Sequence, residues 1–244
     1  MALIDLANPS RFRALADTLL PWLGIATIVA FGVGLDQALR APDDYQQGAT
    51  VKIMFLHVPS AWLSMMAWGL MSAAALGTLV WRHPLADVAA KAAAPLGAAF
   101  TLLCLVTGSL WGRPMWGTYW VWDARLTSEL VLFLMYLGVM ALWQTIEDPT
   151  RAARAVAVLT LVGAIDLPII KFSVDWWNTL HQPASVFRVG GSTIDASLLA
   201  PLFVMAIAFT LLFFTLHLAA MRNEIMRRRV RTLMMLQAQA AGGH

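Results

Sequence analysis

Six hydrophobic segments separated by short polar connections make up most of the chain. They are Leu19–Leu35, Ala61–Trp81, Ala92–Leu110, Leu130–Ile146, Ala155–Ile170 and Leu198–Ala220. Each segment has about the length that a helix needs to cross the roughly 30 Å hydrocarbon core of a bilayer. No Ser/Gly-rich linker or low-complexity stretch divides them, so nothing in the chain marks a domain boundary. The pattern predicts an all-α integral membrane protein with six transmembrane helices, folded as one polytopic domain over residues 1–244.

The composition supports this prediction and excludes two kinds of chemistry. Hydrophobic residues make up 59% of the chain and charged residues 13%, and the mean hydropathy is +0.68. The single cysteine, Cys104, lies inside the third segment, so the chain by itself supports neither dithiol exchange nor an internal disulfide. It also lacks the Gly-x-x-x-x-Gly-Lys-Ser/Thr sequence that binds nucleotide phosphates. A process driven by ATP would therefore need a partner.

The distribution of lysine and arginine over the connections predicts the orientation in the membrane. Eleven lie on one side, at positions 11, 13, 82, 91, 151, 154, 222, 227, 228, 229 and 231, and six on the other, at positions 40, 52, 113, 125, 171 and 188. The excess predicts cytoplasmic N- and C-termini, with the first, third and fifth connections outside.

No cleavage site follows the first hydrophobic segment, so we expect it to be retained. The basic tail, residues 222–244, is expected to contact the anionic lipid of the bilayer, and we expect no nucleic-acid partner.

Residues 111–128, in the third connection, form an unusually aromatic segment. Four tryptophans and one tyrosine occur between Trp111 and Asp123. Indole rings bury a large apolar face and keep one N–H donor, so they concentrate at membrane interfaces and on platforms for flat ligands. An ordinary aromatic belt explains two or three of these tryptophans, but it does not explain the charged residues beside them. We therefore expect an external, Trp-rich interfacial segment that receives a large flat ligand.

The spacing after Gly117 predicts a helix lying along the membrane surface. On such a helix Trp116, Trp120 and Asp123 share one face. Trp122 and Arg125 would share the opposite face, so that Arg125 would point away from Trp120 and Asp123.

Two histidines lie on the external side of the predicted topology. His57 comes just before Pro59, whose fixed φ suits the first turn of a helix, so His57 is expected at the outer mouth of the second helix. His181 lies in the loop after the fifth helix. Two neutral imidazoles on opposite faces of a porphyrin would give a six-coordinate haem. Either histidine alone would more often be an interfacial hydrogen-bonding residue, but together with the external tryptophans they favour ligation.

The other three histidines lie in segments expected on the cytoplasmic side, at positions 83, 217 and 244. Among the external basic residues, Arg125, Arg113 or Arg188 would be able to pair with the anionic propionates of a haem.

Asp166 and Lys171 lie in the fifth helix, where burying a charged side chain in the membrane is energetically costly. A structural ion pair or hydrogen bond explains them best, and coupling to a partner protein is the alternative.

The stretch Trp116-Gly-Thr-Tyr-Trp-Val-Trp-Asp-Ala-Arg-Leu-Thr127 closely resembles the "WWD" signature of haem-handling proteins in cytochrome c biogenesis. His57-Val-Pro and Val174-Asp-Trp-Trp-Asn-Thr-Leu-His-Gln182 look like the loops of the haem exporter protein C (CcmC) family of the bacterial system I pathway. Six helices and the chain length are also similar to that family. The resemblance covers essentially the whole chain.

This resemblance implies a function more specific than spacing alone provides. It implies that haem b binds as a transient cargo at the periplasmic face of the inner membrane, with His57 and His181 as candidate axial ligands of the iron. Trp116, Trp120 and Trp122, with Asp123, would form the platform. The expected partners are the periplasmic haem chaperone CcmE and a membrane complex with the ATPase CcmA and with CcmB and CcmD.

The resemblance implies haem transfer rather than an enzyme, although a role in covalent attachment of haem to the chaperone stays open. A membrane cytochrome b and a structural permease subunit of an ABC exporter are the alternatives. Helices one, three, four and five contain no histidine, which argues against the cytochrome. A permease subunit would need neither external histidines nor a tryptophan platform.

Overall fold

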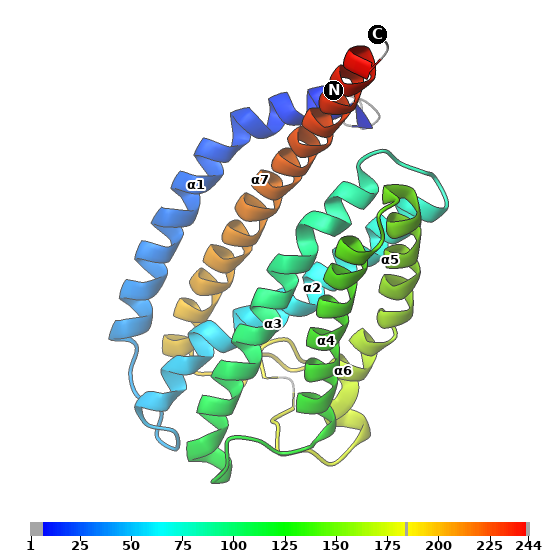
Figure 1. Cartoon of the computed structure of the whole chain (residues 1–244). Helices are drawn as coiled ribbons and strands as arrows, with labels where there is room; N and C mark the ends of the chain where they lie inside the picture. The colour runs from blue at the N-terminus through cyan, green and yellow to red at the C-terminus, as the bar shows by residue number, and fades with distance from the viewer. Residues whose placement is uncertain (1–6, 184, 243–244) are drawn as a thin grey trace.

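The computed structural model describes residues 7–183 and 185–242, and almost all of this part of the chain is helical (Figure 1). The helices are α1 (Pro9–Arg40), the short 3₁₀ helix η2 (Ala49–Ile53), α2 (Met54–Leu79), α3 (Ala86–Trp116), α4 (Ala124–Thr145), α5 (Pro149–Gly163), α6 (Asp166–Trp176) and α7 (Ala196–Gly242). The described residues contain no β-strand, only one isolated bridge between Asp44 and Gly48. The ends of the predicted domain and tail, including His244, lie outside these residues.

Six helical spans are long and apolar enough to cross a membrane, which confirms the predicted fold class. The spans are Pro9–Arg40, Ala49–Leu79, Ala86–Trp116, Ala124–Thr145, Pro149–Trp176 and Ala196–Ala241. Each span begins before the hydrophobic segment seen in the sequence, and four of them also end beyond it, because further residues continue the helices past the apolar core. The chain is therefore a multi-pass membrane protein.

Capping residues explain where several helices begin. Asn8 accepts a hydrogen bond from the backbone N–H of Ser10, and Pro9 occupies the first position of α1. Asp148 accepts from the N–H groups of Thr150 and Arg151 at the start of α5. Such side chains satisfy backbone donors that have no partner within the helix.

The fifth span is broken, whereas the sequence pattern predicted one continuous helix over Ala155–Ile170. Helix α5 ends at Gly163, and α6 begins at Asp166. Pro168 has no N–H to donate to the carbonyl of Ala164, and its ring crowds that turn, so it belongs in the first turn of a new helix. The break leaves Asp166 largely buried, with one carboxylate oxygen that has no hydrogen-bond partner in the described part of the chain. Among residues 7–183 and 185–242, the expected ion pair or hydrogen bond of the Asp166 side chain is not seen.

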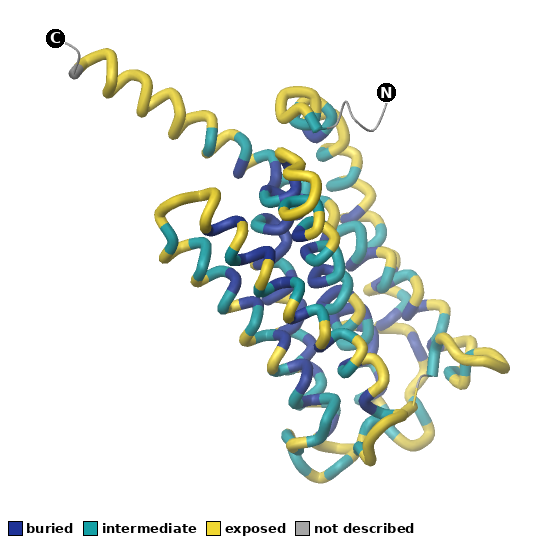
Figure 2. The backbone as a smooth tube through the Cα atoms, turned by 90° about the vertical axis from the view of Figure 1, so that its right-hand side faces the viewer, coloured by how far each residue is buried: buried dark blue, intermediate teal, exposed yellow. Residues whose placement is uncertain are grey.

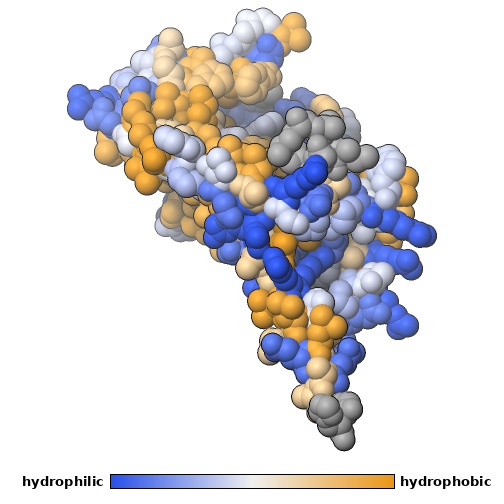
Figure 3. All heavy atoms as spheres, turned by 90° about the horizontal axis from the view of Figure 1, so that it is seen from above, coloured by the Kyte–Doolittle hydropathy of each residue, from blue (hydrophilic) through white to orange (hydrophobic). Residues whose placement is uncertain are grey.

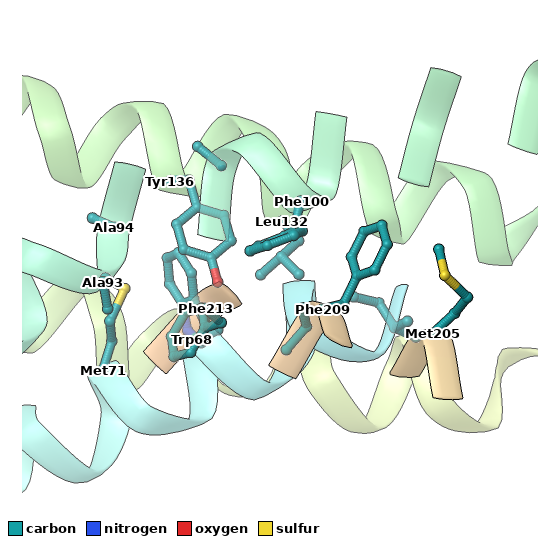
Figure 4. Close-up of a cluster of buried hydrophobic side chains, with 14 of the residues drawn as sticks. Trp68, Met71, Ala93, Ala94, Phe100, Leu132, Tyr136, Met205, Phe209 and Phe213 are labelled. Carbon is teal, nitrogen blue, oxygen red and sulfur yellow. The ribbon is translucent and has the colours of Figure 1, made fainter. Parts of the chain in front are cut away.

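The core lies among α2, α3, α4, α5 and α7 (Figures 2 and 4). Trp68 on α2 is fully buried, and its ring meets Tyr136 of α4 edge to face at 4.7 Å. Its indole N–H donates to the carbonyl of Thr160 at 3.0 Å, and the Tyr136 hydroxyl donates to the carbonyl of Ser64 at 2.7 Å. Because both polar tips are satisfied inside the bundle, these large side chains fix the relative positions of α2, α4 and α5.

Helix α1 packs along α7, and both termini lie at the same end of the bundle (Figure 1). Beyond the bundle α7 projects as an exposed helix (Figure 2). Hydrophilic side chains gather on this end of the molecule (Figure 3). Part of the positive charge of the tail is paired inside the chain, since Arg222 contacts Asp17 at 3.0 Å and Arg228 contacts Asp87 at 2.7 Å. His217 is buried and stacked on Phe213, as expected for a packing residue.

Candidate functional site

The loops that join α1 to α2, α3 to α4, and α6 to α7 gather at the end of the bundle opposite the termini (Figure 1). A cavity of about 60 Å³ opens beneath them. Its lining comes from α2, α3, α4, α6 and the loop after α6, and consists of His57, Ala61, Met65, Cys104, Leu105, Gly108, Arg125, Leu126, Glu129, Ile170 and His181. Two of these residues are the histidines singled out in the sequence. Both histidines therefore line the same cavity.

His57 lies one turn inside α2, which begins at Met54 and not near Pro59 as the sequence suggested. Its Nδ1 lies 3.1 Å from the carbonyl oxygen of Cys104 and 3.1 Å from the hydroxyl of Thr107, both on α3. A carbonyl can only accept a hydrogen bond, so Nδ1 carries the proton and Nε2 keeps its lone pair. The edge of Trp111 packs against the ring, with centroids 5.7 Å apart.

His181 is held in the same tautomer by a different acceptor. Its Nδ1 lies 3.0 Å from Oδ2 of Asp123, and its side chain is mostly buried. Burial lowers the pKa of His181 below its ordinary value of 6.5, although the hydrogen bond that it donates to Asp123 opposes this effect. In the neutral ring the proton sits on Nδ1, and Nε2 keeps its lone pair. A histidine whose Nδ1–H is bound to a carboxylate is the usual arrangement of a metal-ligating imidazole.

Asp123 has a second role at the same place. Its Oδ1 accepts a hydrogen bond from the backbone N–H of Leu126 at 2.8 Å and so caps α4, which begins at Ala124. The predicted surface helix after Gly117 is wrong, because residues 117–123 are not helical. Gly117 adopts φ of +76°, a left-handed conformation that ends α3 at Trp116. The side chain of Asp123 serves as a cap, and an N-cap residue itself has the extended backbone that Asp123 adopts.

The tryptophans of the segment therefore do not share one helical face. Trp116, at the end of α3, meets the ring of His181 edge to face at 4.7 Å. Trp120 and Trp122 lie edge to face with each other at 5.4 Å, and Trp122 is 76% exposed. An open hollow of about 320 Å³ adjoins them, lined by Val121, Trp122, Asp123, Asn178, Thr179 and Leu180. Because Asp123 is hydrogen-bonded to His181, this hollow is a direct neighbour of the histidine cavity.

Arg125 lines the histidine cavity, contrary to the orientation expected from a regular helix. Its Nε donates to the hydroxyl of Ser173 at 2.9 Å, and its Nη2 reaches the carbonyl of Lys171 at 3.4 Å, so it ties α4 to α6. Arg113 lies over the ring of Tyr119 at 5.4 Å, and Arg188 is exposed. Of the three candidate arginines, only Arg125 lines this cavity.

Sequence reasoning missed several residues that shape the site. Glu129, read as a residue that favours a helix N-terminus, is buried in the second turn of α4 and lines the cavity, with one carboxylate oxygen unpartnered in the described residues. An acidic residue inside a membrane span was the available signal. Thr107 and the carbonyl of Cys104 carried no such signal. Every residue of a helix has a backbone carbonyl, so the sequence does not show which carbonyl will accept a hydrogen bond from a histidine.

The arrangement can supply two neutral nitrogen ligands to one metal centre. No group of three or more His, Cys, Asp or Glu side chains suited to a bare metal ion occurs among residues 7–183 and 185–242. Two imidazole ligands match the axial positions of a haem, whose other four ligands come from the porphyrin. Ligand pockets for molecules of drug size span about 300–1,000 Å³, so a porphyrin ligated here would extend beyond the enclosed cavity.

Comparison with known proteins gives a consistent family assignment. The model of the family described as "CcmC: Heme exporter protein C" matches residues 2–236. A relative named "Heme exporter protein C" from Bradyrhizobium diazoefficiens is 77% identical over 238 residues, covering 98% of this chain and 90% of the relative. Proteins of the same name from Escherichia coli K12 and Paracoccus denitrificans are 48% and 44% identical. These cover 91% and 98% of this chain, and 90% and 100% of the relatives.

Proposed function

The chain belongs to the haem exporter protein C family, and on this premise we propose that it binds haem at the periplasmic face of the bacterial inner membrane and delivers it to the haem chaperone CcmE. Family membership fits a role in haem handling for cytochrome c maturation, with haem as the cargo. The proposal adds the type of haem, haem b, and the direction of transfer.

One observation carries the proposal. The two external histidines line a single cavity, and each has its Nδ1 bound to an acceptor, so both Nε2 atoms are available to iron. Iron held between them would be coordinated by His57 from α2 and His181 from the loop after α6. A histidine with a purely structural role has no need to leave Nε2 free toward a cavity shared with a second such histidine.

The placement of the site suits a cargo that must leave again. His181 lies in a loop, Trp122 is exposed, and the open hollow lies beside the Asp123–His181 pair. A porphyrin would therefore keep one edge outside the enclosed cavity, where a partner protein can collect it. Loops also move more readily than helices packed in a core, so release need not disturb the bundle.

We further propose that the chain acts in a membrane complex with the ATPase CcmA and with CcmB and CcmD. The absence of a phosphate-binding loop from the sequence supports an external source of energy. The role proposed is transfer, without catalysis by this chain. The proposed orientation places both termini in the cytoplasm and the histidine site in the periplasm, which agrees with their positions at opposite ends of the bundle (Figure 1).

A membrane cytochrome b remains the main alternative, because His57 lies within a helix. Such a protein holds its haem permanently and cycles the iron between two oxidation states. Transfer predicts instead that purified CcmE removes haem from the reconstituted protein within one round of mixing.

The absorption spectrum of the purified protein with bound haem tests the site. The wild type should show the Soret band of a six-coordinate haem, and His57→Ala and His181→Ala should each shift or remove it. His83→Ala, which changes an exposed histidine at the other end of the bundle, is the control. If both site variants kept the wild-type spectrum and haem content, ligation by these residues would be wrong.

A further inference from the structure

Gly108 on α3 lies directly beneath the imidazole of His57. A Cβ atom built on this glycine would stand 2.9 Å from Cε1 and 3.4 Å from Nδ1 of the ring. The first distance is far shorter than an ordinary van der Waals contact, so a side chain at position 108 requires the ring to move. The ring of His57, which belongs to α2, is hydrogen-bonded to α3 through the Cys104 carbonyl and the Thr107 hydroxyl.

Movement of the ring would cost the contacts that select its tautomer. Both hydrogen bonds of Nδ1 are 3.1 Å long and come from residues within one turn of Gly108. A shift away from α3 lengthens both and moves them out of the range of about 2.7–3.2 Å that N–H···O hydrogen bonds occupy. Trp111, one turn further along α3, limits the directions in which the ring can escape.

We propose that Gly108 is a positioning residue for haem ligation, because the missing side chain lets the backbone of α3 set the plane and tautomer of His57. This inference rests on the proposed function, since it assumes that His57 ligates the iron. Gly108 also lines the cavity. In this proposal its effect on haem passes through the histidine ring and not through a direct contact.

The test uses Gly108→Ala in the full-length protein loaded with ferric haem. Alanine is a better helix former than glycine, so the substitution does not weaken α3 as a helix. Gly69→Ala on α2 is the matched control, because a Cβ there would meet nothing within 4 Å. Transfer of haem to excess apomyoglobin measures retention, and electron paramagnetic resonance of the ferric low-spin haem reports the orientation of the imidazole planes.

We expect Gly108→Ala to lose haem about 10- to 100-fold faster, the usual effect of disturbing a residue that orients a metal ligand. Its resonance spectrum should shift, whereas Gly69→Ala should match the wild type. In a His57→Ala background, Gly108→Ala should change the rate less than twofold, because its effect passes through the ring. Should the single variant fail to fold, the His57→Ala/Gly108→Ala double variant should recover folding.

Three results would overturn the inference: a wild-type rate and spectrum for Gly108→Ala, an equal effect in the His57→Ala background, or a folding defect that the double variant does not relieve. The proposed function fails separately. It fails if His57→Ala itself leaves haem retention and the spectrum unchanged, whatever Gly108→Ala does.

Discussion

Nδ1 of His181 lies 3.0 Å from Oδ2 of Asp123, although the two residues are 58 positions apart in the chain. The other carboxylate oxygen of Asp123 caps α4 through the N–H of Leu126. One aspartate thus fixes both the start of a transmembrane helix and the orientation of a loop histidine. A carboxylate carries two acceptor oxygens in one rigid plane, which makes this double role possible.

Replacing Asp123 separates these two roles. Asp123→Ala should lower haem affinity about 10- to 100-fold, because His181 loses the acceptor that orients it. The lost cap should also cost about 1 kcal/mol of stability. Asp123→Asn keeps one acceptor oxygen, which can still cap α4, but it places an NH2 donor where Oδ2 accepts from His181. It should therefore retain the stability and lose the haem affinity much as Asp123→Ala does. Haem titration followed at the Soret band, with thermal unfolding in detergent, measures both effects.

Asp148→Ala is the matched control, since Asp148 caps α5 and contacts no histidine. It should show the loss of stability with wild-type haem affinity. Equal losses of affinity in Asp123→Ala and Asp148→Ala would mean that capping, and not the bond to His181, explains the effect.

Trp120 and Trp122 should matter more for transfer than for binding. Replacing both by Ala should slow delivery of haem to CcmE, because Trp122 is exposed at the open hollow and Trp120 packs edge to face against it. Single aromatic contacts contribute about 0.5–1.5 kcal/mol beyond area burial, so ligation by the histidines should persist. Trp22→Ala, which removes an exposed indole of α1, is the control. Unchanged loading of CcmE by the double variant would exclude a platform role for these two residues.

Arg125 offers a test of whether the site recognises the haem propionates. Arg125→Ala should weaken haem binding by about 1.5–3 kcal/mol, the range of a hydrogen bond to a charged group. The loss should vanish when the propionates of the haem are esterified, since the ester carries no charge for the guanidinium to pair with. Ser173→Ala is the control for the tie between α4 and α6. An equal loss with the ester would assign Arg125 a structural role only.

The topology can be checked with introduced cysteines in a Cys104→Ser background. Cysteines at Gln46, Asn178 and Arg188 should react with a membrane-impermeant thiol reagent from the periplasmic side, because these exposed positions lie at the histidine end of the bundle. Cysteines at His83 and Glu147, also exposed, should react only after permeabilisation. Labelling of positions 178 and 147 from the same side would contradict the shared external site.

The sequence alone determined the architecture and singled out the two candidate ligands. Burial in a bilayer demands long apolar helices, so six spans could be read directly from hydropathy. His57 and His181 stood out because the chain has only five histidines, and the tryptophan segment stood out because four indoles lie within thirteen residues. Their shared side of the membrane followed from the alternation of the connections.

Local conformation between helices was less accessible to sequence reasoning. The spacing of Trp116, Trp120 and Asp123 fitted a helix, yet Gly117 ends α3 and Asp123 begins α4. Periodicity over seven residues is a weak signal, and a cap needs a non-helical backbone, so the local chemistry of glycine and aspartate prevailed. Likewise Pro168 divides the fifth span, which its apolar composition did not show.

Only the tertiary structure decided how the histidines are held. The acceptors of their Nδ1 atoms are a helix carbonyl 47 residues away and a carboxylate 58 residues away. Hydropathy determines that a helix spans the membrane, but not which of its turns faces a given residue of another helix. That register depends on the packing of large side chains such as Trp68 and Tyr136 in the core. It is this packing that places the backbone of α3 beneath His57 and the cap of α4 beside His181.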